Sequence, residues 1–199
     1  MTTVAVIYHS GFGHTKLQAE AVERGAAAVD GVEALLLTAE EAGADLDRLD
    51  DADAIIFGSP TYMGSMSAEM KKFLETAAAK WFTHAWKDKV AGAFTNSSSF
   101  SGDKVNTLVG LMINAMQQGM IFVSLGVHPA ASDPESMNHI QGPGPDVVNR
   151  LGSYIGPMAA SFQVNPGDAP STGDLATAEA YGTRVATITQ QLNRGRAEA

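Results

Sequence analysis

Five short and almost uninterrupted apolar runs recur along the chain, and stretches with the spacing of amphipathic helices separate them. The apolar runs cover residues 4–8, 32–37, 54–57, 90–95 and 121–125. A continuous apolar run of this length is typical of a strand that is buried on both faces of a sheet. The helical patterns cover residues 14–29, 67–80, 103–118 and 175–192. This alternation predicts the α/β class, with one domain over residues 1–199 and a five-stranded parallel sheet covered by helices on both faces.

Two connections in this pattern are irregular. Residues 38–53 read as a short acidic linker between the second and third strands. About fifty residues, 126–174, show no strong periodicity and are rich in Gly, Pro, Ser and Asn. Because this long loop follows the carboxyl end of a strand, where open α/β sheets bind ligands, we expect a functional or interface loop rather than a disordered insertion.

Composition and charge exclude several classes of protein. The chain has no cysteine, which rules out disulfides, iron–sulfur clusters and a thiol nucleophile, so electron transfer would need a bound cofactor. Its net charge of −9 argues against binding to nucleic acid or to an anionic membrane surface. The uncharged stretch 109–127 contains Asn114 and Gln117, so a buried helix and strand explain it better than a membrane span. The start of the chain lacks a basic leader, and we expect a cytoplasmic protein.

Three loops follow predicted strands and would open on the same edge of the sheet. Residues 9–15 contain two glycines and two hydroxyl side chains before a helix, an arrangement that holds phosphate through backbone N–H groups. Residues 59–67 offer Tyr62 and Met63 as a surface for an aromatic ligand. Residues 95–103 are rich in hydroxyl side chains that suit the polar edge of a heterocycle. The first loop fits neither the dinucleotide fingerprint, since Lys16 stands where a third glycine is needed, nor a P-loop.

Together these motifs resemble the flavodoxin-like FMN proteins, most closely the NAD(P)H:quinone oxidoreductases of the tryptophan-repressor-binding-protein type. The similarity extends over almost the whole chain, including residues 152–156 and the last helix. It implies a flavodoxin-like three-layer sandwich with strand order 2-1-3-4-5. It also implies FMN as cofactor, NADH or NADPH as reductant, a quinone as acceptor, and a homo-oligomer, dimer or tetramer, that completes each site from neighbouring subunits.

The resemblance also assigns residues, and it assigns no catalytic side chain and no metal because the flavin carries the chemistry. The implied cofactor-binding residues are Ser10, Gly11, Phe12, Gly13, His14, Thr15, Pro60, Thr61, Tyr62, Met63, Gly64, Asn96, Ser97, Ser98, Ser99, Phe100, Ser101 and Gln118. Phe12 and Trp81 are the implied substrate residues, near the nicotinamide and the quinone respectively.

The chain departs from the family pattern at three positions. Tyr62, Gln118 and Val127 stand where the family has arginine, histidine and tyrosine. FMN binding depends mainly on backbone amides, so these changes bear on the choice of nicotinamide and acceptor. An NADPH-dependent FMN reductase, a flavodoxin-type electron carrier without its own small-molecule substrate, and a flavin-binding assembly protein with little turnover are the alternatives.

Overall fold

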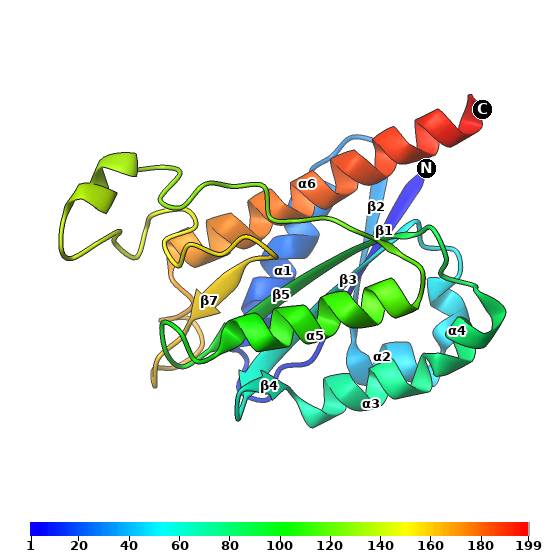
Figure 1. Cartoon of the computed structure of the whole chain (residues 1–199), viewed down its shortest axis with the longest axis horizontal. Helices are drawn as coiled ribbons and strands as arrows, with labels where there is room; N and C mark the ends of the chain where they lie inside the picture. Colours follow the sequence, from blue (N-terminus) through cyan, green and yellow to red (C-terminus); the bar gives the residue numbers. More distant parts are fainter. Residues whose placement is uncertain (199) are drawn as a thin grey trace.

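A mainly parallel sheet forms the centre of the molecule in a computed structural model that describes residues 1–198 (Figure 1). Its strands are β1 (Thr2–Tyr8), β2 (Val32–Thr38), β3 (Ala54–Tyr62), β4 (Ser65–Met66), β5 (Val90–Ser97), β6 (Ile121–Phe122) and β7 (Met158–Ala160). The main strands lie in the order β2-β1-β3-β5-β6, while β4 pairs with β3 and β7 with β5. Counting only the five predicted strands, this is the order 2-1-3-4-5, so the predicted fold class and strand order are confirmed.

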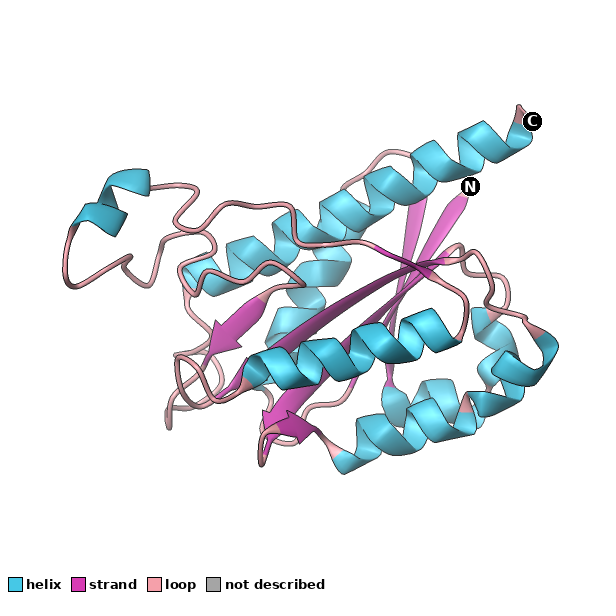
Figure 2. Ribbon diagram, viewed as in Figure 1, coloured by secondary structure: helices cyan, strands magenta, loops and turns pink. Residues whose placement is uncertain are grey.

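Helices cover both faces of the sheet, as Figure 2 shows. They are α1 (His14–Ala27), α2 (Ala39–Ala44), α3 (Ala68–Thr76), α4 (Ala78–Thr83), α5 (Lys104–Gln117) and α6 (Thr172–Ala197), with short 3-10 helices η1 (Leu46–Leu49) and η2 (Pro134–Asn138). One core lies between the sheet and helices α1 and α6, and a second core lies between the sheet and helices α2, α3 and α5. Within residues 1–198, no helix combines the length and the apolar character needed to cross a bilayer.

Two predicted segments on the second face, a linker and a helix, differ from the structure in detail. The expected acidic linker after β2 folds into α2 and η1. Thr38 begins α2 with a capping box, because its Oγ1 accepts a hydrogen bond from the Glu41 N–H while Glu41 Oε2 accepts one from the Thr38 N–H. The helix expected over residues 67–80 starts at the predicted cap, Ser67, but is divided at Ala77 into α3 and α4.

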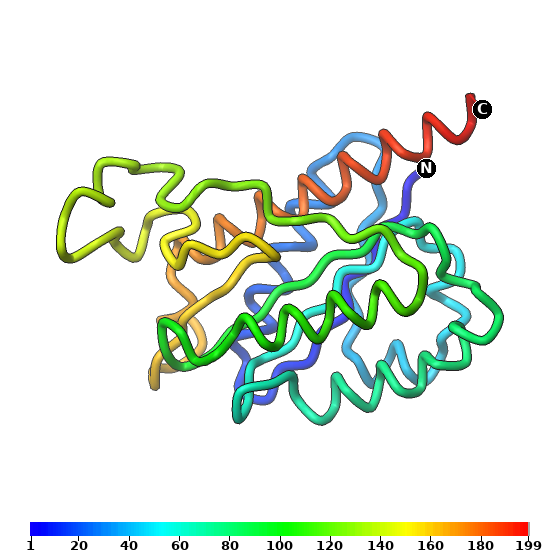
Figure 3. Tube along the Cα trace, viewed as in Figure 1, coloured from blue at the N-terminus to red at the C-terminus, as the bar shows by residue number. Residues whose placement is uncertain are grey.

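The fifth position of the sheet is shared by two short strands. The strand expected over residues 121–125 is regular only in β6, which pairs with the start of β5 at Val90 and Ala91. The chain then leaves the sheet, projects outward through η2, and returns as β7 beside the end of β5 (Figure 3). The segment predicted as one long loop over residues 126–174 therefore contains a strand, and it ends where α6 begins, at Thr172.

Candidate active site

The carboxyl ends of β1, β3 and β5 meet at one edge of the sheet and enclose a cleft of about 450 Å³. This edge lies at the lower left of Figure 1. The cleft is lined by Ser10, Phe12, His14, Thr15, Pro60, Thr61, Tyr62, Asn96, Ser97, Ser98, Ser161, Phe162, Gln163 and Val164. The three loops that the sequence analysis selected therefore converge, and a fourth segment, residues 161–164, joins them; we call it the closing segment.

The first loop presents the start of α1 to the cleft. Gly13 adopts φ 92°, in the left-handed region that favours glycine, and its N–H donates to Ser10 Oγ at 3.0 Å. Among the described residues, no side chain caps the first turn of α1, and that turn carries no acidic residue. Its free backbone N–H groups and the positive end of the helix dipole therefore face the cleft, and they suit an anion.

The second loop packs against the first. The rings of Phe12 and Tyr62 meet edge to face with centroids 6.0 Å apart. Burial raises the pKa of Tyr62 above its usual value, although a hydrogen bond from the Gly11 backbone acts in the opposite direction. Tyr62 therefore remains neutral at physiological pH, and its hydroxyl is held against the first loop. Asn106 Nδ2 on α5 donates to the Gly64 carbonyl at 2.7 Å and so anchors the turn after β3.

The floor of the cleft is a layer of polar side chains on β3 and β5. Thr61 Oγ1 lies 2.8 Å from the hydroxyl oxygens of both Thr95 and Thr107. Asn96 is buried, and its Nδ2 donates to Ser161 Oγ at 3.0 Å. Asn96 Oδ1 is also buried, yet it has no hydrogen-bond partner within residues 1–198. A buried acceptor without a partner is costly, so this atom suits a ligand that brings a donor into the cleft.

The closing segment was not among the predicted site residues. It follows β7 directly, and the Ser161 N–H donates to the Ser97 carbonyl at 2.9 Å. His14 Nε2 donates to the Val164 carbonyl at 2.8 Å, which ties the closing segment to the first loop. These two hydrogen bonds join residues 64 and 150 positions apart in sequence, and only the location of the long weakly patterned segment pointed to the closing segment.

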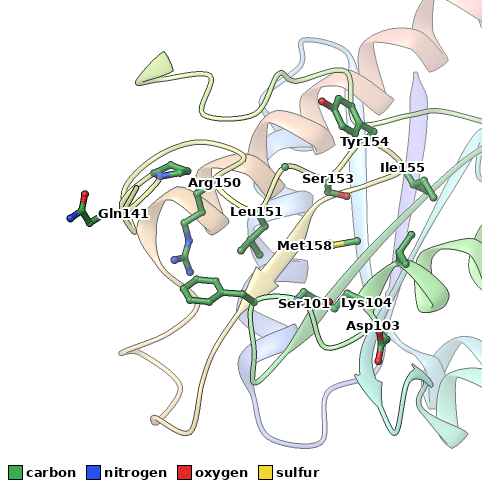
Figure 4. Close-up of a pocket in the computed structure, with 14 residues that line it drawn as sticks. Ser101, Asp103, Lys104, Gln141, Arg150, Leu151, Ser153, Tyr154, Ile155 and Met158 are labelled. Atoms are coloured by element: carbon green, nitrogen blue, oxygen red, sulfur yellow. The ribbon is translucent and has the colours of Figure 1, made fainter. Parts of the chain in front are cut away.

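A second cavity of about 660 Å³ lies behind the serine-rich loop (Figure 4). Phe100 and Ser101 line this second cavity rather than the cleft, together with Lys104 and Arg150. Phe100 packs edge to face on Phe162, with ring centroids 5.1 Å apart, so the two aromatic rings separate the second cavity from the cleft.

The remaining predicted site residues fall into two groups. Gly11, Gly13 and Ser99 belong to the loops around the cleft without lining it, and Met63 and Gly64 form an exposed turn with φ 49° and 80°. Gln118 and Trp81 lie far from the cleft within this chain. Gln118 ends α5, and its Nε2 donates to the Ala77 carbonyl at 3.1 Å. Trp81 lies on α4, which Figure 1 shows at the opposite end of the sheet from β4 and β7.

The cleft fits FMN in three respects. It has an uncapped helix start for a phosphate, an unpartnered buried acceptor for a ring N–H, and a volume within the usual range for small-molecule sites. Among residues 1–198, no three His, Asp or Glu side chains come together in a cluster that could hold a metal ion.

Comparison with known families decides the assignment. Residues 14–130 match the family described as NADPH-dependent FMN reductase. The chain belongs to this family. Membership confirms the resemblance to flavodoxin-like FMN proteins and the prediction of an FMN-dependent oxidoreductase that uses a nicotinamide reductant.

Several proteins are similar in sequence to this member of the FMN reductase family over nearly the full length of both chains. The chain is 41% identical over 197 residues to "Flavodoxin FldP" of Pseudomonas aeruginosa, with 97% of this chain and 100% of the relative covered. It is 32% identical over 213 residues to an "NAD(P)H dehydrogenase (quinone)" of Syntrophobacter fumaroxidans, with 96% and 98% covered. Among solved structures, the flavodoxin, WrbA-like protein from Agrobacterium tumefaciens is 40% identical in sequence to this chain. Its structure matches with a TM-score of 0.73, covering 96% of this chain and 99% of that protein.

Proposed function

We propose that this protein oxidises NAD(P)H and reduces a quinone, with FMN bound in the cleft at the carboxyl ends of β1, β3 and β5. The observation that carries the proposal is the pairing of two features at one site. An uncapped helix start lies at one end of the cleft, and a polar layer with a free acceptor, Asn96 Oδ1, forms its floor. Its similarity to a relative named as a quinone dehydrogenase supports the choice of acceptor. The expected location in the cytoplasm stays a prediction.

In this proposal the first loop holds the phosphate. The hydroxyl groups of Ser10 and Thr15 lie at the start of α1 together with the backbone N–H groups of Phe12, His14 and Thr15, while the Gly13 N–H is taken by Ser10 Oγ. Hydrogen bonds from fixed amides to a charged phosphate are strong, and no lysine or arginine is needed.

The other two loops and the closing segment hold the ring system and the ribityl chain. Asn96, Ser97 and Ser98 donate to or accept from polar ring atoms, while Phe12 and Tyr62 cover a ring face. Phe162 and Val164 exclude water from the opposite wall. Bound FMN supplies the hydride and electron transfer, and the protein orients it and shields it from solvent.

Trp81 and Gln118 enter the proposal only through a neighbouring subunit. Trp81 is 47% exposed and stacks edge to face on the exposed Phe82, so both rings offer apolar surface to a second copy of the chain. Ile140, which is 99% exposed near the tip of the projecting segment, offers another such surface. We therefore propose a homo-oligomer in which Trp81 from one subunit approaches the cleft of another.

The direct test is the steady-state oxidation of NADH and of NADPH by FMN-loaded protein, with and without a benzoquinone. We expect turnover that depends on the quinone, with parallel initial-rate plots because both substrates use one cleft in turn. Turnover that ignores the quinone but depends on free FMN would instead identify an FMN reductase.

A flavodoxin-type electron carrier is the second candidate. It is favoured by the 41% identity to a relative named as a flavodoxin and by the net charge of −9, which suits docking to a basic redox partner. A carrier is not reduced directly by a nicotinamide. Anaerobic mixing with NADPH distinguishes the two candidates, since only the oxidoreductase loses its yellow flavin absorbance without a partner protein.

A further inference from the structure

Lys104 is a fully buried lysine at the start of α5, directly behind the serine-rich loop. Its side chain is 0% exposed. Its Nζ donates to Ser97 Oγ at 2.8 Å and to the Ser99 carbonyl at 2.5 Å. Ser97 lines the cleft, so the ammonium group is separated from it by a single side chain. A buried lysine is rare because its charge loses hydration, and its position therefore needs a reason.

The ammonium group of Lys104 has no carboxylate of its own within residues 1–198. Arg150 and Asp174 form a buried bidentate pair, with Nε–Oδ1 at 2.8 Å and Nη2–Oδ2 at 2.9 Å. Asp174 Oδ2 also accepts the Ala160 N–H at 3.0 Å, so this carboxylate is already fully engaged. Within residues 1–198, Lys104 forms no ion pair, and Asp103 beside it forms none with its Nζ. Figure 4 shows Lys104 and Arg150 around the second cavity, which Asp103 also lines.

We propose that Lys104 is a positioning residue for the cofactor. Its ammonium group fixes the serine-rich loop in the shape that lines the cleft, and it places a buried positive charge beside the ring-binding end. This role rests on the proposed placement of FMN. A positive charge close to the flavin ring favours the reduced flavin, which is the more negative form, and it strengthens the binding of an anionic cofactor.

The charge on Lys104 depends on pH within an accessible range. Burial lowers its pKa to about 8, while Asp174 on α6 acts to raise the pKa and Arg150 acts to lower it. The ammonium is therefore present at pH 7 and is lost as the pH rises above 8. FMN affinity is expected to fall over the same range, whereas the FMN phosphate, with a second pKa of about 6, is already a dianion.

The experiment compares wild-type protein with Lys104→Met, which removes the charge and both hydrogen bonds, and Lys104→Gln, which removes the charge and keeps an N–H donor on a side chain one atom shorter. The matched control is Lys89→Met. Lys89 Nζ also donates to two carbonyls, those of Asp50 and Ala52, but it precedes β5 at the far end of the sheet. FMN affinity is measured by flavin fluorescence from pH 7 to pH 9.5, and the midpoint potential of bound FMN is measured at pH 7.

We expect Lys104→Met to weaken FMN binding about tenfold at pH 7 and to shift the midpoint potential to a more negative value. Lys104→Gln should lie between it and the wild type in affinity. Both variants should lose the decline in affinity above pH 8 that the wild type shows, and Lys89→Met should retain it. If Lys104→Met does not fold, Lys104→Gln and the wild-type pH profile still decide the question.

Two results would overturn the proposal. Equal affinities, potentials and pH profiles for the wild type and the Lys104 variants would show that Lys104 is only structural. A wild-type protein that does not bind FMN would overturn the placement of the cofactor together with the role of Lys104.

Discussion

At the scale of single residues, Gly13 is where the backbone of the first loop has least freedom to change. Its φ of 92° is unfavourable for any residue with a side chain, and a Cβ atom there would lie 2.8 Å from Pro166 Cγ. Pro166 follows the closing segment, so a side chain at position 13 would push apart two walls of the cleft.

We expect Gly13→Val to lower FMN affinity at least tenfold, because the loss of one or two charge-assisted hydrogen bonds costs about 1.5–3 kcal/mol each. Gly31→Val is the control. Gly31 has a similar φ of 77° but precedes β2 at the other end of the sheet, and a Cβ there would meet only Gln190 Nε2 at 3.4 Å. Both variants should lose stability in urea unfolding because of their positive φ, but only Gly13→Val should lose FMN affinity. Normal FMN binding by Gly13→Val would disprove the role of the first loop.

Lys104 should also leave a signature in the stability of the cofactor-free protein. Burial lowers its pKa to about 8, whereas the unfolded chain has the usual value of about 10.4. Between these values the unfolded state binds more protons, so the free energy of unfolding rises with pH, by on the order of 2–3 kcal/mol in total, and this gain is absent below pH 8. Urea unfolding at pH 7, 8.5 and 10 should show the rise in wild-type protein but not in Lys104→Met. Parallel profiles for the two proteins would contradict it.

At the scale of elements, the Arg150–Asp174 pair fastens the edge of the sheet to α6. Asp174 lies in the first turn of α6 and accepts the N–H of Ala160 at the end of β7. Arg150 also lies over the Phe100 ring, 5.5 Å from its centroid. One carboxylate therefore connects a helix, a strand and the wall between the two cavities.

Arg150→Met should destabilise the protein by about 3 kcal/mol, because it leaves Asp174 buried and without its cation. Arg24→Met is the matched control. Arg24 on α1 pairs at 3.5 Å with Glu179, which lies on α6 as Asp174 does, but both side chains of this pair are about half exposed. Its loss should cost less than about 1 kcal/mol in the same denaturant titration. Equal losses in the two variants would show that the buried pair contributes no more than the surface pair.

Element boundaries could be predicted to within about two residues where the apolar pattern is long, as in β1, α1 and α5. The predicted end of β3 at residue 57 is wrong, because its pairing with β5 continues through Ser59 and Pro60 and the strand runs to Tyr62. β7 could not be predicted, because it has only three residues and becomes a strand through its pairing with Thr95, Asn96 and Ser97. The short helix α2 was missed although Thr38 and Glu41 carry the spacing of a capping box, since its six residues are too few to show a helical period.

At the scale of the whole molecule, open α/β sheets bind ligands at the carboxyl ends of their strands. This rule alone predicted that three loops converge on one site, without any knowledge of side-chain contacts. The rule does not reveal the fourth wall, because hydrogen bonds such as Asn96–Ser161 join segments 65 positions apart. The same rule does not explain Trp81 and Gln118. The resemblance assigns both to the site, but within a single chain they lie at the opposite end of the sheet.

The proposed assembly predicts a split between the two half-reactions. Trp81→Ala should slow quinone reduction more than flavin reduction by NAD(P)H, and wild-type activity should fall on dilution at saturating FMN. Phe82→Ala, which removes the neighbouring exposed ring, should affect assembly without this split. Stopped-flow measurement of each half-reaction, with light scattering for the oligomeric state, provides the check. Full activity of a monomer with an unaffected Trp81→Ala variant would exclude the shared site.

β6 and β7 share the edge of the sheet beside β5, and β7 is the part of this edge that lies at the cleft. Because β7 pairs with β5 at only three positions and the chain between β6 and β7 makes a long excursion, we expect β7 and the closing segment to open together more readily than the centre of the sheet. Their backbone amides should exchange with deuterium much faster than those in the middle of β5 in cofactor-free protein. FMN, which contacts this unit in the proposed site, should slow its exchange most. Cofactor could then enter and leave through local opening of this one edge, while the rest of the fold stays closed to solvent.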